Sequence, residues 1–251
     1  MDNNEEIIDE NIDEKLESNK EEDEKNKKSG GNNVTLIIIR AILCSLIVFF
    51  AFKAIVVYNS EGKIVEMASK PIIYIYPEKE QEVRVTLSDK DLLTCSYPKY
   101  ESGWDVIANQ NGDLVDLDTG KKLYSLYYES ENKENYKIEK DGFCIKKEDI
   151  VPFLEEKLEI LGLNYKEKEE FIVYWLPQLE KHNYIYIRFA DKEEIANNME
   201  LEITPKPDTL IRVMMTWKGL EMPVDVNEQK LTEVNRTGYT IVEWGGTEIN
   251  D

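Results

Sequence analysis

Residues 34–58 form an unbroken apolar stretch, and this stretch constrains the chain more than any other part of the sequence. It reads VTLIIIRAILCSLIVFFAFKAIVVY and contains only two charged side chains, Arg40 and Lys53. About 20 apolar residues in a helix, rising 1.5 Å each, are enough to cross the roughly 30 Å hydrocarbon layer of a membrane. Each cation lies near one end, where its head group can reach the membrane surface. The stretch therefore predicts a single transmembrane anchor.

Two other interpretations of residues 34–58 remain open. One is a buried core helix, although a helix without a polar face is hard to place in a domain of this size. The other is a cleaved signal peptide. Its amino-terminal region would then be 33 residues long and acidic, and its apolar part would exceed the roughly 7 to 15 residues typical of such peptides. An uncleaved anchor explains the pattern best.

The sequence before the anchor is polar and acidic. Residues 1–33 contain 12 acidic and five basic side chains, a net charge of −7, and no aromatic residue. Such a segment cannot bury enough apolar surface to offset the entropy of ordering. A disordered acidic tail is therefore predicted for residues 1–33.

Residues 70–247 are predicted to form one α+β domain, mainly antiparallel β-sheet with one packed helix, preceded by the single transmembrane helix. Residues 59–69 are a predicted linker, and residues 248–251 a tail. The helix is expected over 148–161, because apolar residues recur there at helical spacing. Runs of β-branched and aromatic residues predict strands, the first two as a hairpin and the next three as a meander: 72–76, 83–87, 104–108, 113–117, 122–129, 171–176, 184–189, 201–204, 209–217 and 238–244.

The side of the membrane on which the domain lies is predicted from cations and cysteines. Four Lys or Arg residues flank the amino-terminal end of the anchor and three flank the other end, which favours a cytoplasmic amino terminus. Cys95 and Cys144 are the only cysteines beyond the anchor. A disulfide between them would stabilise the folded domain by about 3–4 kcal/mol. It would also indicate an extracytoplasmic domain in the cell envelope. Two unrelated thiols are the alternative.

Five sequence runs between residues 70 and 247 carry a resemblance to a known family. They are KPIIYIYPE (70–78), LTCSYPKY (93–100), EFIVYWLP (170–177), PKPDTLIRVMMTWK (205–218) and VEWGG (242–246). In these runs the chain resembles an uncharacterised family of hypothetical proteins from low-GC Gram-positive bacteria. The resemblance implies a single exported or anchored bacterial domain. It implies no activity and contributes no catalytic residue.

Motifs for common enzyme chemistry are absent from the sequence. His182 is the only histidine, which excludes multi-histidine metal centres, and its polar surroundings predict a solvated loop residue. There is no nucleophile elbow, phosphate-binding glycine loop or Cys-x-x-Cys pair. Nucleotide and thiol redox chemistry are therefore not expected.

One short polar segment contains oxygen ligands of the kind that calcium prefers. Its spacing does not match an EF-hand loop, and the bidentate Glu at the end of such a loop is missing. Paired hairpin turns explain it better, so no cofactor is predicted and calcium is the alternative. The residues are Asn109, Asn111, Asp113, Asp116 and Asp118.

Aromatic residues suggest a binding groove that stacks on sugar rings or on a peptide. Alternating aromatics in strands also serve as core residues and cross-strand pairs, and this alternative stays open. The candidates are Tyr97, Trp104, Tyr124, Tyr127, Tyr128 and Tyr136.

Glu129 and Glu243 each lie at the end of a predicted strand, beside aromatic residues. Two carboxylates on one sheet can act as the acid and base of a glycoside hydrolase. Solvated or salt-bridged carboxylates are the alternative for both residues.

Charge limits the partners of the domain. The chain carries −20; the tail contributes −7 and the anchor +2, which leaves −15 for residues 59–251. Nucleic acid and anionic polymers are repelled by such a surface, whereas basic envelope proteins and neutral glycans are not. The sequence thus favours a membrane-anchored cell-surface binding or interaction module. The alternatives are a wall-directed glycan hydrolase that uses the paired carboxylates and a structural component of an envelope complex.

Overall fold

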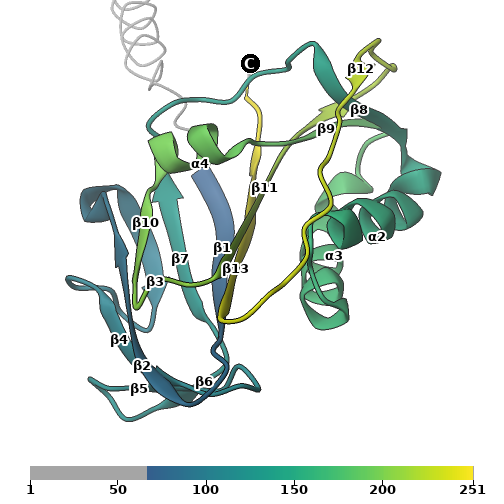
Figure 1. Ribbon diagram of the computed structural model, residues 1–251. Coiled ribbons are helices and arrows are strands. Elements are labelled where there is room, and N and C mark those ends of the chain that lie inside the picture. The colour runs from purple at the N-terminus through teal and green to yellow at the C-terminus, as the bar shows by residue number, and fades with distance from the viewer. Residues whose placement is uncertain (1–66, 251) are drawn as a thin grey trace, which may run out of the picture. The chain divides into compact units, whose positions relative to one another are not determined.

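The computed structural model describes residues 67–250, which form two β-sheets and three α-helices (Figure 1). The predicted acidic tail, the predicted anchor at 34–58 and most of the predicted linker lie outside the described residues. Within residues 67–250, no helix is both long enough and apolar enough to cross a membrane.

The larger sheet has eight strands in the order β12, β8, β9, β11, β13, β1, β7 and β3. The pairs β11–β13 and β8–β12 are parallel, and the other neighbours are antiparallel. Strand β1 occupies an interior position between β13 and β7. The strands are β1 (Met67–Tyr76), β3 (Leu93–Tyr97), β7 (Leu126–Glu131), β8 (Asp141–Lys146), β9 (Tyr184–Phe189), β11 (Thr209–Leu220), β12 (Asn227–Glu228) and β13 (Thr240–Glu248).

The smaller sheet is antiparallel throughout, in the order β10, β2, β4, β5 and β6. It contains the predicted meander, although the third run of that meander divides between β6 in this sheet and β7 in the larger one. The predicted hairpin of β1 and β2 is wrong, because the two strands pair in different sheets. The strands are β2 (Gln81–Leu87), β4 (Trp104–Ala108), β5 (Leu114–Asp116), β6 (Lys122–Leu123) and β10 (Leu201–Thr204).

The prediction of one packed helix after a transmembrane helix needs correction, because the described residues contain three α-helices and none that can span a membrane. Residues 171–176, predicted as a strand, lie inside α3. Its start is fixed by a capping box, in which the Asn164 side chain accepts from the Glu167 N–H and the Glu167 side chain accepts from the Asn164 N–H. The helices are α2 (Ile150–Ile160), α3 (Tyr165–Leu179) and α4 (Lys192–Asn198), with 3₁₀ turns η1 (Lys90–Leu92) and η2 (Lys147–Asp149).

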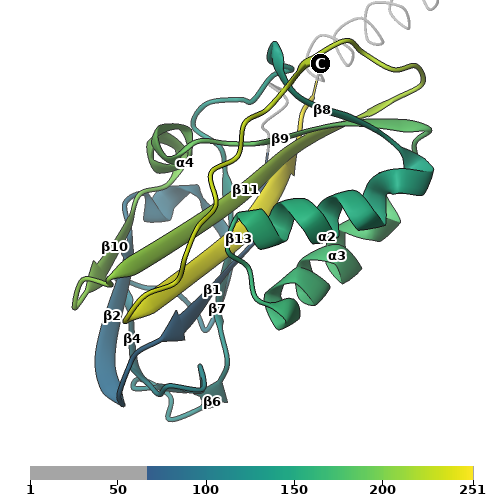
Figure 2. The same cartoon turned by 45° about the vertical axis from the view of Figure 1, so that its right-hand side comes forward.

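The two faces of the larger sheet form two separate cores. Helices α2 and α3 cover one face, which we call the helix side, and the smaller sheet packs on the other, the sheet side (Figure 2). Side chains alternate between faces along a strand, so Ile72 and Tyr74 of β1 belong to the helix side while Ile73 and Ile75 belong to the sheet side. The position of a residue in its strand therefore decides which core it enters.

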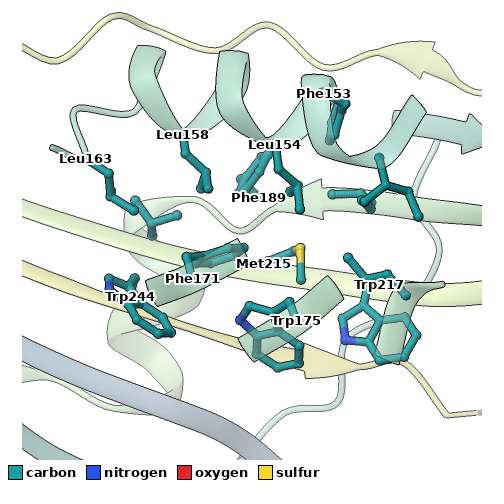
Figure 3. Packing of buried hydrophobic residues seen from close by; sticks show 14 of the residues in the cluster. Phe153, Leu154, Leu158, Leu163, Phe171, Trp175, Phe189, Met215, Trp217 and Trp244 are labelled. Carbon is teal, nitrogen blue, oxygen red and sulfur yellow. The ribbon is translucent and has the colours of Figure 1, made fainter. Parts of the chain in front are cut away.

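Aromatic rings dominate the core on the helix side. Figure 3 shows Leu154 and Leu158 of α2 above a row of large side chains from α3, β11 and β13. The Phe171 and Trp244 rings lie edge to face with centroids 5.3 Å apart, and those of Trp175 and Trp217 are 6.4 Å apart. Such contacts fix α3 on β11 and β13, because buried aromatic pairs add to the stabilisation from burial alone.

A partly buried ion pair holds the segment between β11 and β13 against the helices. Glu167 is fully buried, accepts from the Asn164 N–H at 2.8 Å and forms an ion pair with Arg236. The Arg236 guanidinium also donates to the Gly162 carbonyl at 2.7 Å. The same carboxylate therefore caps α3 and fastens the connection that leads into β13.

Candidate functional site

The predicted disulfide between Cys95 and Cys144 is wrong, because both residues are free thiols. Cys95 lies in β3 and Cys144 in β8, and five strands separate β3 from β8 in the larger sheet. Neighbouring strands are about 4.8 Å apart, whereas a disulfide needs Cα atoms within about 7 Å. The cysteines therefore give no support for an extracytoplasmic location.

Alkylation of the native protein without reductant is expected to label both thiols. Cys95 should react first because it is exposed, whereas Cys144 is half-buried and its Sγ accepts the Val224 N–H at 3.4 Å. Peptide mass spectrometry after short and long exposure measures the order. A peptide pair linked through Cys95 and Cys144 would contradict the expected result.

Glu243 is part of a closed network on the sheet side of β13. It is 1% exposed, accepts from the Tyr128 hydroxyl at 2.7 Å and forms an ion pair with Arg212. The Arg212 guanidinium also donates to the Met199 carbonyl at 2.9 Å. Burial alone would lower the pKa of Arg212, but the Glu243 carboxylate holds that pKa above its ordinary value. Glu243 is thus a structural residue with no access to a ligand.

Glu129 lies on the opposite face of the sheet from Glu243. Tyr128 points to the sheet side with Glu243, so its neighbours Tyr127 and Glu129 point to the helix side. Strand β1 also separates β7, which carries Glu129, from β13. An acid and base pair must flank one glycosidic bond from a common cleft. These two carboxylates cannot do so, because the sheet lies between them.

Five of the six predicted aromatic residues divide into two groups. Trp104 and Tyr128 are buried on the sheet side, where the Trp104 indole N–H donates to the Pro98 carbonyl at 2.9 Å. Tyr97, Tyr124 and Tyr127 lie on the helix side. Tyr97 and Tyr127 are cross-strand neighbours in β3 and β7. Three of the predicted tyrosines can therefore belong to an aromatic surface, whereas Trp104 and Tyr128 are core residues.

These three tyrosines form an accessible surface together with Tyr174 of α3. Tyr97 is 53% exposed, Tyr124 is 59% exposed, and Tyr127 and Tyr174 are half-buried. We call this surface the tyrosine face, defined by Tyr97, Tyr124, Tyr127 and Tyr174. The core on the helix side includes residues of β1 but none of β7 or β3. The rings on β7 and β3 therefore lie beyond the edge of α3 and remain accessible.

A lysine lies between two rings of the tyrosine face. The Lys70 Nζ is 5.6 Å from the Tyr127 ring centroid and 5.4 Å from that of Tyr174, which are cation–π distances. Lys70 has a φ of 59°, and the register of β1 shifts between Ser69 and Ile72. A left-handed backbone at a non-glycine residue costs about 1–3 kcal/mol. The bulge that brings Lys70 onto the rings is therefore stabilised by its surroundings.

Carboxylates border the tyrosine face on both sides. The Tyr74 hydroxyl donates to Glu170 Oε2 at 2.6 Å, and the Tyr74 ring lies 6.4 Å from that of Tyr124. Burial raises the pKa of Tyr127, and its hydrogen bond with Glu129 raises it further. Burial also raises the pKa of Tyr124 and Tyr174. These phenols therefore stay protonated at neutral pH and present both rings and hydroxyl groups.

The polar segment that suggested calcium is explained by its turns. Asn109 Oδ1 accepts the N–H groups of Asn111 at 2.9 Å and Asp113 at 3.1 Å. Asp116 Oδ2 accepts the Thr119 N–H at 3.2 Å, and Asp118 sits in the same turn. Within the described part of the chain, no three His, Cys, Asp or Glu side chains are grouped to hold a metal.

The single histidine of the chain is a packing residue. His182 is half-buried, and its ring centroid lies 6.0 Å from that of Trp217. A Cβ at Gly219 would come within 2.2 Å of the imidazole ring, so the glycine makes room for it. The predicted solvated loop histidine thus packs against β11.

Sequence reasoning missed Lys70, Tyr174 and Glu170 as parts of this surface. Tyr174 was assigned to a strand, and Glu170 immediately precedes that strand. The Asn-x-x-Glu capping signal at Asn164 and Glu167 was available to indicate a helix instead.

Comparisons of the chain with models of protein families, with curated proteins and with solved structures give no match.

Proposed function

We propose that the domain is a binding module of the cell surface and that its tyrosine face contacts a neutral glycan. The observation that carries the proposal is that Tyr97 and Tyr127 share one accessible sheet face and that Tyr124, just before β7, lies beside it. Tyr97 and Tyr124 are more than half exposed. Large aromatic side chains in strands normally bury their rings. Rings that stay accessible beside carboxylates fit a ligand with apolar faces and polar edges.

Sugar rings have this chemistry. The C–H face of a pyranose can stack on a tyrosine ring, while its hydroxyl groups exchange hydrogen bonds with Glu129, Glu170 and the phenols. A neutral chain is favoured because the net charge of residues 59–251 is −15, which repels anionic polymers. Lys70 between two rings supplies one local donor.

An extended peptide fits the same surface less well. A peptide would add to the edge strand β3, which has only five residues and is followed directly by Pro98. Proline has no N–H to donate, and short edges ended by proline resist strand addition. The accessible rings, and not the strand edge, therefore provide the recognition.

The location at the extracytoplasmic side of a membrane is also part of the proposal. Its support is the apolar sequence of residues 34–58 and the small excess of cations before it, and these residues lie outside the described part of the chain.

Binding of uncharged polysaccharides tests the proposal. Affinity electrophoresis of the protein in gels containing hydroxyethyl cellulose, laminarin or mannan should retard the wild type in at least one gel. Tyr97→Ala and Tyr124→Ala are each expected to weaken binding about tenfold, since a stacked aromatic contributes about 1.4 kcal/mol or more at such a site. Both side chains are exposed, so the unfolding midpoint should not change.

Tyr165→Ala is the matched control, because Tyr165 is an exposed tyrosine of α3 outside the tyrosine face. It should bind as the wild type does. Equal loss in all three variants, or no retardation in any of the three gels, would overturn the proposed function.

A further inference from the structure

We propose that the outer surface of the α2–α3 pair is a docking groove for a basic amphipathic helix of a partner protein. This surface is separate from the tyrosine face and is independent of glycan binding. The groove lies between the two helices, with Pro152 on one wall and Ile172 on the other. The short connection between Ile160 and Tyr165 makes the two helices a hairpin, so they present adjacent outer faces.

Helix α3 has apolar side chains on its inner side and on its outer side. Its inner side buries Phe171, Trp175 and Leu179 in the core. Its outer side carries Tyr165, which is 72% exposed, and Val173, which is 67% exposed. A helix at a protein surface normally presents polar residues outward, so exposed apolar side chains with a polar rim indicate an interaction site.

The spacing of these side chains matches the way a helix is bound. Tyr165, Glu169, Ile172 and Val173 follow one another at intervals of four, three and one residues, which places them on one face of α3. On α2, residues 152, 155, 156 and 159 share a face in the same way. The α3 stripe can contact the apolar face of a third helix, whose apolar residues recur at i, i+3, i+4 and i+7. The α2 stripe is mainly acidic and can contact Lys or Arg side chains at the edge of that face.

Charge decides what kind of helix fits. The rim of the groove carries Glu155, Glu156, Glu159 and Glu169 against one cation, Lys168. Lys168 is already paired with Glu159 at 2.7 Å. In residues 67–250, Glu155 and Glu169 have no ion-pair partner, so two carboxylates are available for Lys or Arg side chains of the partner.

Charge also disfavours occupants from this chain. The segment before the anchor carries −7, and a second copy of the chain carries −20, so both are repelled by the acidic rim. The partner is therefore a different, basic polypeptide. Helix α2 has 11 residues and α3 has 15, so at 1.5 Å per residue the groove accommodates about three to four helical turns.

A designed peptide tests this inference on the full-length protein held in nanodiscs of uncharged lipid, with empty nanodiscs as the blank. The probe is a fluorescent 15-residue helix of Leu and Lys, designed with one apolar face and followed by anisotropy. The wild type should bind it. Glu155→Lys combined with Glu169→Lys should weaken binding at least tenfold, and Val173→Asp should weaken it at least fivefold. All three positions are exposed, so the variants are expected to remain folded.

Two controls separate docking in the groove from general attraction between opposite charges. Glu80→Lys combined with Glu82→Lys makes the same change in net charge at exposed positions at and just before β2 and should alter binding less than twofold. A peptide of the same composition with its Leu and Lys residues shuffled should bind at least tenfold more weakly. The inference is overturned if both double variants lose binding equally, or if the shuffled peptide binds as well as the helix.

Discussion

Glu243→Ala is expected to lower the free energy of unfolding of the domain by about 3–5 kcal/mol, because the substitution leaves the Arg212 guanidinium buried without its carboxylate. The Tyr128 hydroxyl loses its acceptor at the same time. Urea denaturation followed by tryptophan fluorescence measures the change, since the four tryptophans are buried in the two cores. Most domains have only about 5–15 kcal/mol of stability, so the variant should lose a large fraction of it.

Glu129→Ala is the matched control for this experiment. Glu129 is a half-buried strand carboxylate on the opposite face, and its loss should reduce stability by less than about 1 kcal/mol. Arg212→Met combined with Glu243→Leu should recover much of the lost stability, because two apolar side chains leave no unpaired charge. If Glu243→Ala were as mild as Glu129→Ala, Glu243 would not be the structural residue described above.

The domain is also expected to lose stability steeply above pH 10. Burial raises the pKa of Tyr74, Tyr128 and Tyr239 above the ordinary value of about 10 in the folded state. The unfolded chain releases these protons near pH 10 while the folded chain retains them. Their contribution to stability is therefore complete below pH 10 and is lost as the pH rises toward the folded-state values. Each such tyrosine removes about 1.4 kcal/mol of stability per pH unit in this window.

Urea midpoints at several values between pH 8 and pH 11.5, with phenolate absorbance read in parallel, measure this loss. Tyr239→Phe isolates the contribution of one phenol, because the Tyr239 hydroxyl is buried and has no hydrogen-bond partner among the described residues. In this variant the free energy of unfolding should fall less steeply above pH 10, by about 1.4 kcal/mol per pH unit. Titration of every tyrosine near pH 10 in a protein that stays folded would contradict the result.

The secondary structure was predictable wherever local pattern and packing agree. The strands at 104–108, 184–189 and 201–204 are confirmed, because alternating or β-branched residues bounded by polar turns favour strands and the packing there agrees. Residues 171–176 have the same composition but form part of α3, where the capping box and the burial of Phe171 and Trp175 outweigh the local preference for strand. Composition alone therefore misassigns a helix made of strand-forming residues.

The site was predictable only in part, because its residues depend on sheet register. Tyr127 and Tyr128 are adjacent in the sequence, yet one joins the tyrosine face and the other the buried network of Glu243. A shift of one residue in a strand exchanges the two faces, and the sequence does not give the register. The predicted pairing of Glu129 with Glu243 fails for the same reason, and that of Cys95 with Cys144 fails because sheet order is not a local property.

Nuclear magnetic resonance of the tyrosine rings during titration with a neutral glycan that retards the wild type tests the central claim most directly. Glycan binding at the tyrosine face predicts that the ring signals of Tyr97, Tyr124 and Tyr127 shift with a common saturation curve, while those of Tyr128 and Tyr165 do not move. Shifts confined to Tyr165, or no ring shifts at saturation, would contradict it.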